Sequence, residues 1–483
     1  MDKNRKEHLK EFVRKMIGWI YSDLLWLSDE EAQLADEQRN RLVAELSGWG
    51  TFSFKGSKVH CGPLSPGCLI CGNGGWDCNF INRQCTRDCF YCPQDRAINK
   101  ESESKTEGFL FKDPSEHILF MKTFNIKGVG FSGGEPLLVL DRLLAHISAI
   151  RQEFGDSLYL WIYTNGDLVN RGVLKKLRQA GLDEIRFDLS ARSYNLAPVV
   201  LAKEFIPTVT VEIPAIPEDF DLLKNLLGKM EVIGVNFLNL HQLHATKHNY
   251  KALLKRHYHF LHQPSVPVME SETSALRLLM YAKENQINLP INYCSCAYKN
   301  RFQGLDVRQR RGRVALKGCE ELTDAAYIRS FRVVDSQDKI LSMVKRLEKD
   351  NCPSVLWACH DRKNELAIHS DLLRYVDWST AELTLSYSEP VVRLKNQAAG
   401  VMASNLEPMN AEVYKVNTWS EIFTECWRRL YKEGGSAEGV FEFLYQNYPL
   451  EGNKDIANLQ KEMHELKQIA EWEELPNRLP EVF

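Results

Sequence analysis

The sequence has no long apolar run and almost no net charge. No stretch approaches the ~18 consecutive apolar residues of a membrane-spanning helix. The opening residues, MDKNRKEHLKEF, lack the apolar core of a secretory signal. The net charge is only −3 over 483 residues, so no general basic field of the kind that attracts nucleic acid is present. We therefore expect a cytoplasmic protein with neither a membrane nor a nucleic acid as partner.

Disulfides are also not expected, although the sequence contains 13 cysteines. The number is odd, and the cytosol keeps thiols reduced. The cysteines are unevenly distributed, because seven of them fall between positions 61 and 92. Clustered thiols in a reducing compartment are typical of metal ligands.

The chain is too long for one ordinary core, so two or three domains are expected. No internal repeat or low-complexity tract is evident, and residues 1–50 have the apolar spacing of helices. From about 75 to 292, β-rich runs alternate with helical patterns such as 138–154 and 171–181. The predicted strands are 78–82, 127–132, 158–164, 184–190, 208–215 and 235–240. Repeated βα units predict an α/β fold with a parallel sheet, either a curved partial barrel or an open doubly wound sheet. Function is expected at the C-terminal ends of its strands.

A change of pattern near residue 381 predicts a separate small α+β domain. A helix is predicted at 336–350 within the mixed region before it. After it come short predicted strands and then three predicted helices. The strands are ELTLSY, VVRLKN, VMASN and AEVYKVN (411–417), and the helices lie at about 418–432, 436–447 and 453–470.

The segment CTRDCFYC places Cys85, Cys89 and Cys92 in a C-x3-C-x2-C spacing directly after a predicted strand. Three thiolates on one short loop suit three corners of a [4Fe–4S] cluster. The fourth iron would then be open to a small molecule, which favours catalysis over electron storage. Zinc is the alternative, but it prefers four ligands, usually in C-x2-C pairs.

This segment resembles the signature of radical S-adenosylmethionine (radical SAM) enzymes. FSGGEPLL (131–138), YTNGD (163–167) and RFDLSAR (186–192) follow in the family's order, and the resemblance covers residues ~78–300. It implies a partial (β/α) barrel, a [4Fe–4S] cluster, S-adenosylmethionine (SAM) and an external electron donor. The SAM-binding residues that it implies are Tyr91, Gly133, Gly134, Glu135, Thr164, Asn165, Asp188 and Ser190. Glycines let backbone approach the SAM amino group, whereas ordinary strand-end capping is an alternative role for the last four.

A second cysteine set precedes the first. Cys68 and Cys71 form a C-x2-C pair, half a site, in a Gly/Pro-rich segment read as a loop. The order of motifs resembles a branch related to pyruvate formate-lyase activating enzymes, and it implies an auxiliary iron–sulfur cluster on Cys68, Cys71 and Cys294. The fourth ligand is Cys61, Cys78, Cys296 or the substrate, with Cys319 as a further candidate thiol. A structural zinc or unligated buried thiols are the alternatives.

The last hundred residues resemble a PqqD-like peptide-recognition domain, also called a RiPP recognition element. The resemblance implies that residues 381–483 bind the leader of a ribosomal precursor peptide. The leader would add a strand at 411–417, opposite 456–470. A generic α+β appendage or dimerisation domain is the alternative. The expected divisions are 1–74 (helical extension and Cys-containing loop), 75–300 (partial barrel), 301–380 (bridging region) and 381–483 (recognition domain).

Together the two resemblances imply a radical SAM peptide maturase. Within that group the chain is similar to maturases of Nif11-like or nitrile-hydratase-like leader peptides, including spliceases that remove a tyramine unit and leave an α-keto-β-amino acid. The alternatives are a glycyl-radical-enzyme activase and a non-catalytic, zinc-containing peptide scaffold. No catalytic residue is assigned. Tyr293, Arg301 and His241 are candidates for substrate contact, although such residues are more often structural.

Overall fold

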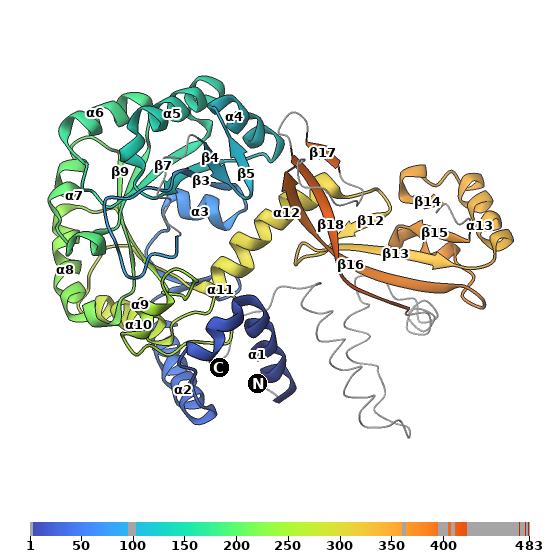
Figure 1. The fold of residues 1–483 in the computed structure, drawn as a ribbon, viewed down its shortest axis with the longest axis horizontal. Helices are drawn as coiled ribbons and strands as arrows, with labels where there is room; N and C mark the ends of the chain where they lie inside the picture. Colours follow the sequence, from blue (N-terminus) through green and yellow to red (C-terminus); the bar gives the residue numbers. More distant parts are fainter. Residues whose placement is uncertain are drawn as a thin grey trace. The chain divides into compact units, whose positions relative to one another are not determined.

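The computed structural model consists of two compact units, Met1–Gly304 with Asn477–Phe483, and Leu305–Pro476 (Figure 1). It describes residues 3–94, 103–359, 364–394, 404–406 and 411–422, together with residues 473, 479 and 482. No helix within these described residues is long and apolar enough to cross a membrane.

An eleven-stranded sheet is the framework of the first unit. Its order is β1-β2-β11-β10-β9-β8-β7-β6-β3-β4-β5, and every pairing from β3 through β6 to β11 is parallel. Antiparallel strands extend it at both ends. The bounds are β1 (Thr51–Ser53), β2 (Lys58–Cys61), β3 (Trp76–Asn82), β4 (Ser104–Thr106), β5 (Phe109–Phe111), β6 (Gly128–Gly133), β7 (Tyr159–Thr164), β8 (Glu184–Phe187), β9 (Thr208–Pro214), β10 (Phe237–His241) and β11 (Ile291–Cys294). The predicted α/β partial barrel is confirmed.

Helices surround the outside of this curved sheet (Figure 1). They are α4 (Pro114–Thr123), α5 (Leu140–Phe154), α6 (Arg171–Ala180), α7 (Ala197–Ala202), α8 (Phe220–Ile233) and α10 (Met269–Glu284). Side chains alternate along each strand, so one face of the sheet is apolar. Val129, Ile162, Ile185, Val211 and Leu238 on that face are fully buried. The other face lines the barrel and carries polar side chains.

The predicted N-terminal helices are present as α1 (Lys3–Ile17) and α2 (Asp29–Leu46). Ser28 begins α2 with a capping box, because its hydroxyl accepts from Glu31 N while the Glu31 carboxylate accepts from Ser28 N. Arg39 of α2 lies 3.5 Å from Glu272 of α10, and both side chains are almost fully buried. The N-terminal extension is therefore packed onto the barrel.

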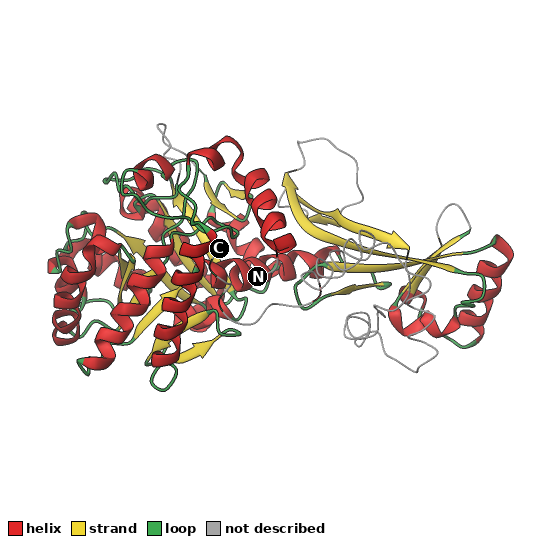
Figure 2. Cartoon of the chain, turned by 90° about the horizontal axis from the view of Figure 1, so that it is seen from below, coloured by secondary structure: helices red, strands yellow, loops and turns green. Residues whose placement is uncertain are grey.

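The second unit is built on an antiparallel sheet, whose long strands are drawn in yellow on the right of Figure 2. Its strand order is β14-β15-β13-β16-β18-β17, with β12 beside β13. Its elements are α12 (Gly304–Ala315), β12 (Glu320–Leu322), β13 (Ile328–Val334), α13 (Gln337–Lys349), β14 (Trp357–Cys359), β15 (Glu365–Ile368), β16 (Glu382–Leu394), β17 (Ser404–Leu406) and β18 (Ala411–Ile422). Ile340, Met343 and Leu347 of α13 belong to the core that covers this sheet.

Three details of this unit differ from the sequence-based expectation. ELTLSY and VVRLKN form one long strand, β16, rather than two. Residues 418–422 continue β18, so the helix predicted from 418 is wrong there, and the rest of it and the helices at 436–447 and 453–470 lie outside the described residues. No boundary falls near residue 381, because β13 pairs with β16 across it.

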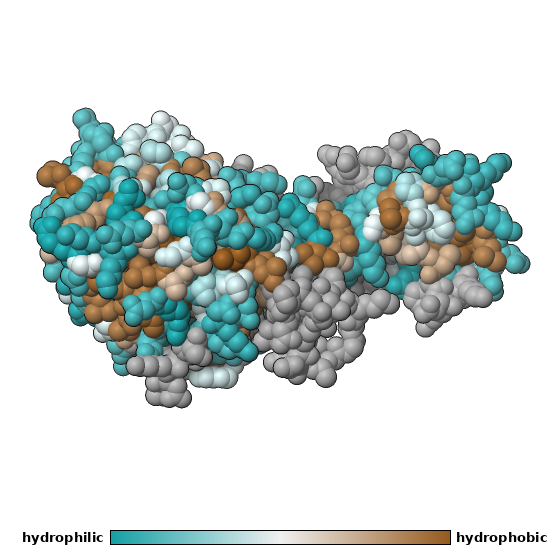
Figure 3. Space-filling view, turned by 90° about the horizontal axis from the view of Figure 1, so that it is seen from above, coloured by the Kyte–Doolittle hydropathy of each residue, from teal (hydrophilic) through white to brown (hydrophobic). Residues whose placement is uncertain are grey.

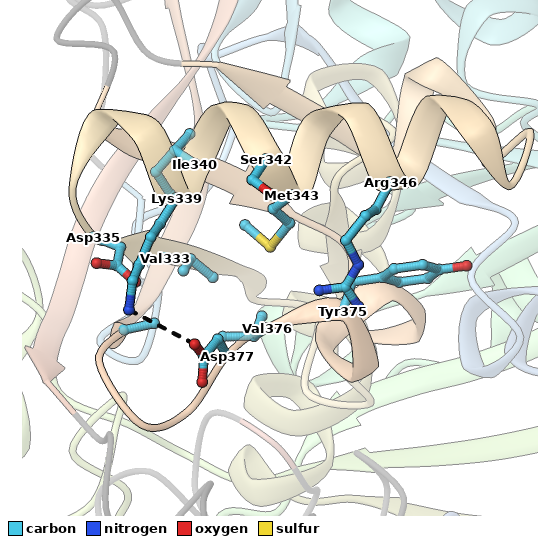
Figure 4. A pocket seen from close by; sticks show the side chains of 11 residues that line it. Val333, Asp335, Lys339, Ile340, Ser342, Met343, Arg346, Tyr375, Val376 and Asp377 are labelled. Carbon is cyan, nitrogen blue, oxygen red and sulfur yellow. Dashed lines mark ion pairs between the residues drawn. The ribbon is translucent and has the colours of Figure 1, made fainter.

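The surface offers scattered apolar residues and a small cavity in the second unit. Figure 3 shows hydrophobic residues in several separate patches among hydrophilic ones. The cavity holds about 110 Å³ and lies between α13 and residues 375–377. Lys339 Nζ approaches Asp377 Oδ2 to 3.7 Å at its rim (Figure 4). Because both side chains are half exposed, this pair contributes little to stability.

Candidate functional site

The cysteine segment begins where β3 ends and is tied at once to the end of β6. Gly134 N donates to Asn82 O at 2.8 Å, and Glu135 N donates to Gln84 O at 2.7 Å. A Cβ on Gly133 would stand 2.0 Å from Asn82 O, and one on Gly134 would stand 1.9 Å from Gln84 O. The close approach of the chain to itself thus already requires both glycines. Their predicted contact with the SAM amino group stays a prediction.

The three predicted cluster ligands lie together on this loop. Cys85 is exposed, whereas Cys89 and Cys92 are half-buried, and Cys92 N donates to Cys89 O at 3.1 Å in a tight turn. Burial raises the pKa of the Cys89 thiol to about 11, with Asp188 and the two neighbouring cysteines adding to the rise. Bound iron would instead hold these sulfurs as thiolates.

The donor set fits an iron–sulfur cluster. Cys85, Cys89 and Cys92 all lie on one short loop, and that loop follows the C-terminal end of the barrel strand β3. Three thiolates placed in this way suit three corners of a cluster.

The loop after β7 fixes the position of the cysteine loop. Arg87 donates to both carboxylate oxygens of Asp167, which follows β7, at 2.6 and 2.7 Å. Thr86 also donates to Asp167 at 2.9 Å, and Asn165 Nδ2 donates to Thr86 Oγ1 at 2.8 Å. The same Asn165 amide lies 3.7 Å from Cys85 Sγ. The Arg87 guanidinium lowers the pKa of the Asp167 carboxyl.

Tyr91, Asp188 and Ser190 meet as a second group. Tyr91 OH donates to Asp188 Oδ2 at 2.9 Å and lies 2.6 Å from Ser190 Oγ. Burial raises the pKa of Asp188 against the opposing effect of these hydrogen bonds. Asn249 also donates to Tyr91 O at 3.0 Å. The second half of the cysteine loop is thereby fixed to the end of β8.

Glu135, Thr164 and Asn165 form a third contact. Glu135 is only 1% exposed and accepts from Thr164 Oγ1 and Asn165 N, each at 2.9 Å, and from Leu137 N at 3.1 Å. Burial raises the pKa of Glu135 to about 7. The predicted SAM-site residues thus gather at the ends of β3, β6, β7 and β8. Their contacts with SAM stay predictions.

Sequence reasoning missed a charged network on the inner face of the barrel. Arg186 pairs with Glu184 at 2.9 Å and with Glu212 at 2.8 Å, while His241 pairs with Glu212 at 2.7 Å. Asn239 also donates to Glu212 at 2.8 Å. Burial alone would raise the pKa of Glu212, but Arg186 and His241 outweigh it and lower that pKa. Alternation along EIRF and TVTVEIP could have revealed these inward charges.

The other two residues suggested for substrate contact differ from His241. Tyr293 is fully buried on the opposite face of β11 and donates to Glu272 at 3.0 Å, so it is a packing residue. Arg301 lies in a π-helical turn, Lys299–Gln303, and is half-buried.

The second cysteine set lies in a different setting from that predicted. Cys68 and Cys71 are on a short helix, α3 (Pro66–Gly72), rather than in a loop. Pro66 favours this helix at its first position, and Ser65 caps it by accepting from Cys68 N at 3.1 Å. Cys294 ends β11, and all three thiols are buried. The side chains of Cys71, Cys294 and Tyr298 pack together in one small buried hydrophobic core.

Comparisons with known proteins agree with this site. The Radical SAM superfamily pattern matches residues 79–212. A Methanocaldococcus jannaschii protein, MJ0021, named as a glycyl-radical enzyme activating enzyme, is 31% identical over 299 residues, which cover 59% of this chain and 78% of that protein.

Two solved structures have a weaker likeness. Streptococcus suis SuiB bound to its precursor peptide SuiA is 11% identical, with a TM-score of 0.34, over 47% of this chain and 50% of that chain. Escherichia coli coproporphyrinogen III oxidase, HemN, is 11% identical, with a TM-score of 0.30, over 50% of this chain and 58% of that chain. The matched parts thus span only about half of those proteins, and likeness of this size says nothing about substrate. The sequence pattern and the M. jannaschii relative show that this chain belongs to the radical SAM superfamily, whose enzymes use a [4Fe–4S] cluster and S-adenosylmethionine.

Proposed function

We propose that this enzyme is a peptide maturase that modifies a ribosomally made precursor peptide, whose leader binds to the second unit. The observation that carries the proposal is an open side of β18. This strand pairs with β16 along its length, but β17 pairs only with Ala411–Val413 on the other side. Among the described strands, nothing pairs with that side of residues 414–422. An extended peptide can add itself there by backbone hydrogen bonds.

The open part of β18 differs from the part that the sequence predicted. Residues 411–417 were expected to be open, whereas β17 covers the first three of them. The helical segment 456–470, expected opposite, lies outside the described residues. The similarity to the M. jannaschii protein covers 59% of this chain. The residues outside the match can therefore have a function that this relative does not share.

The barrel residues have distinct roles in this proposal. When bound at Cys85, Cys89 and Cys92, a [4Fe–4S] cluster together with SAM would supply radical chemistry that removes a hydrogen atom from the substrate. Arg87 and Tyr91 hold the cysteine loop, and Cys85, Cys89 and Cys92 hold the cluster. His241, at the C-terminal end of β10 with a side chain 29% exposed, contacts the peptide inside the barrel.

The finer reaction that we propose is removal of a tyramine unit, which leaves an α-keto-β-amino acid in the peptide. Its support is the sequence resemblance to spliceases. The second candidate is activation of a glycyl-radical enzyme, which the name of the M. jannaschii relative favours.

Anaerobic assays separate these functions. The protein, reconstituted with iron and sulfide, is given dithionite, SAM and a precursor peptide with a Nif11-like leader. We expect 5′-deoxyadenosine and a peptide that has lost the mass of a tyramine unit. Cys89→Ala abolishes both products, whereas Cys359→Ala, at an exposed cysteine of the second unit, leaves them unchanged. An unchanged peptide, with a glycyl-radical signal on a partner enzyme, would refute the maturase and establish the activase.

Leader binding is tested by hydrogen–deuterium exchange on the full chain. Strand addition slows exchange of amides in residues 414–422 when the precursor peptide is present. A peptide without its leader serves as the control and leaves exchange unchanged. Equal exchange with and without the full precursor contradicts the proposed binding edge.

A further inference from the structure

A basic segment, residues 247–257 (KHNYKALLKRH), lies directly against the cysteine loop. Asn249 Nδ2 donates to Tyr91 O at 3.0 Å. The guanidinium carbon of Arg256 lies 3.6 Å from the centre of the Phe90 ring. Both of these loop residues stand between the last two cysteines of the loop. The basic segment therefore covers the outside of the part of the loop that would hold the cluster.

The positive charge of the basic segment is not balanced locally. Lys247, Lys251 and Lys255 are exposed and, among the residues that the structure describes, none of them pairs with a carboxylate. The fourth cation, Arg256, pairs with Glu218 at 2.9 Å. No aspartate or glutamate occurs within the segment itself. The segment therefore presents a surface of net positive charge, which attracts an acidic partner.

An exposed tryptophan adjoins this charge. Trp19 is 66% exposed and lies edge-on to the Tyr250 ring, with the two ring centres 5.5 Å apart. Lys251 Nζ lies 5.9 Å from the centre of the same Tyr250 ring. Aromatic side chains are frequent anchors of protein interfaces, and charges near them guide the encounter with a partner. The surface thus combines an apolar anchor with positive charge.

We propose that the basic segment and Trp19 bind an acidic ferredoxin, which delivers an electron to the cluster on the cysteine loop. One electron leaves the reduced ferredoxin and enters the [4Fe–4S] cluster, and no proton moves and no bond changes. Plant-type ferredoxins have the low reduction potentials that such a step requires. Electron transfer weakens steeply with distance, so the donor must dock against the loop that holds the cluster. The proposal does not depend on which substrate the enzyme modifies.

Binding is measured by isothermal titration calorimetry, with an oxidised plant-type ferredoxin as the probe and the reconstituted full chain as its partner. Lys247→Ser/Lys251→Ser/Lys255→Ser changes only exposed side chains, so the fold is retained. We expect this variant to bind ferredoxin about tenfold more weakly than the unaltered protein, because complementary charge is lost. Its affinity is also expected to depend less on salt, since fewer charges remain to be screened.

A matched control removes the same charge at another place. Lys175→Ser/Lys176→Ser/Lys229→Ser changes exposed lysines on α6 and α8 and leaves ferredoxin binding unchanged. Equal affinity of the two triple variants overturns the proposal. The proposal also fails if the unaltered protein binds a flavodoxin but not the ferredoxin.

The choice of reductant separates docking from chemistry. With reduced ferredoxin as the only reductant, the variant of the basic segment is expected to form 5′-deoxyadenosine about tenfold more slowly than the unaltered protein. With dithionite, a small molecule that needs no docking surface, the two rates are equal. A variant that is slowed equally by both reductants contradicts a docking role.

Trp19→Ser tests the apolar anchor. It weakens ferredoxin binding but keeps the salt dependence of the unaltered protein, because no charge is lost. Leu34→Ser is the control, since Leu34 on α2 is 65% exposed and carries no charge either, and it leaves binding unchanged. Equal binding by these two variants contradicts the proposed surface.

Discussion

Arg87 and Asp167 join two loops by a bidentate ion pair, with Nε 2.6 Å from Oδ2 and Nη2 2.7 Å from Oδ1. Arg87 stands between the cysteines at 85 and 89, and Asp167 follows the end of β7. The pair therefore sets where the cysteine loop lies relative to the strand ends of the barrel. Its geometry is the strong, fork-like arrangement that arginine forms with a carboxylate.

Asp167→Ala is expected to slow 5′-deoxyadenosine formation about tenfold. The substitution removes one charge-assisted pair and so displaces the cysteine loop, and a tenfold slower rate corresponds to an activation barrier that is higher by roughly 1.4 kcal/mol. Arg87 is 43% exposed, so the free energy of unfolding changes by less than about 1 kcal/mol. The control is Glu204→Ala, which breaks the bidentate pair between Glu204, after α7, and Arg171 of α6, and leaves the rate unchanged. Equal rates in both variants would show that Asp167 does not position the loop.

Gly134→Ala is expected to lower iron content and SAM binding together. Its Cβ would stand 1.9 Å from Gln84 O, and that atom is backbone, so the start of the cysteine loop must move. Iron analysis and equilibrium dialysis with SAM measure the effect. Gly228→Ala on α8 meets nothing within 4 Å and is expected to stabilise the fold by up to ~1 kcal/mol. Normal SAM binding by Gly134→Ala would contradict the packing argument.

His146 is expected to make the first unit sensitive to acid. Its Nδ1 lies 3.2 Å from Nδ1 of His117, and Nε2 of His117 lies 2.6 Å from Asp77 Oδ2. Burial, with the charge of His117 adding to it, lowers the pKa of His146 to about 3. The unfolded chain takes up this proton near pH 6.5, whereas the folded chain does not. Stability is therefore full above about pH 6.5 and falls as the pH decreases from there toward 3.

Urea unfolding at pH 7.5 and 5.5 measures this loss. At pH 5.5, one unit below the ordinary histidine pKa of about 6.5, the free energy of unfolding is expected to be lower by about 1.4 kcal/mol for one such group. His146→Gln is expected to lose correspondingly less stability between the two pH values than the unaltered protein. An identical loss in both proteins would assign the acid sensitivity to other groups.

Of the two arginines on β13, Arg329 is expected to contribute more to the free energy of unfolding. Its guanidinium pairs with Glu473 at 2.9 Å and Glu321 at 3.0 Å, and its side chain is only 12% exposed. Arg329→Met leaves two carboxylates without their cation and costs about 3 kcal/mol or more. Arg332→Met is the matched control, since that side chain is 51% exposed and its pair with Glu365 is 3.4 Å long; it costs less than about 1 kcal/mol. Thermal unfolding of both variants decides, and equal losses would contradict the ranking.

Local sequence signals predicted the barrel well because its strands and helices have strong periodicity. The strand predicted at 158–164 is β7, and the helix predicted at 171–181 is α6, which Asn170 caps and Gly181 ends in a left-handed conformation. The three cysteines at 85, 89 and 92 could be predicted as cluster ligands because they are close together in sequence. Such signals need no knowledge of distant contacts.

The structural features that the sequence did not predict depend on tertiary contacts. The helix around Cys68 and Cys71 is too short for periodicity to reveal, and it is stabilised by its cap. Strand β2 is four residues long, and its place beside β11 depends on residues more than two hundred positions away. Residues 418–422 read as helix in isolation, yet pairing with β16 overrides that preference.

The pairing of β2 with β11 gives the barrel interior an order of assembly. Lys58 and Cys294 are 236 positions apart and meet only when these two strands pair, which is a slow, long-range closure. The thiols at 85, 89 and 92, by contrast, are brought together by a single turn of chain. The first three sulfurs therefore come together while the chain is still being synthesised, whereas Cys294 meets Lys58 only after the last barrel strand has left the ribosome.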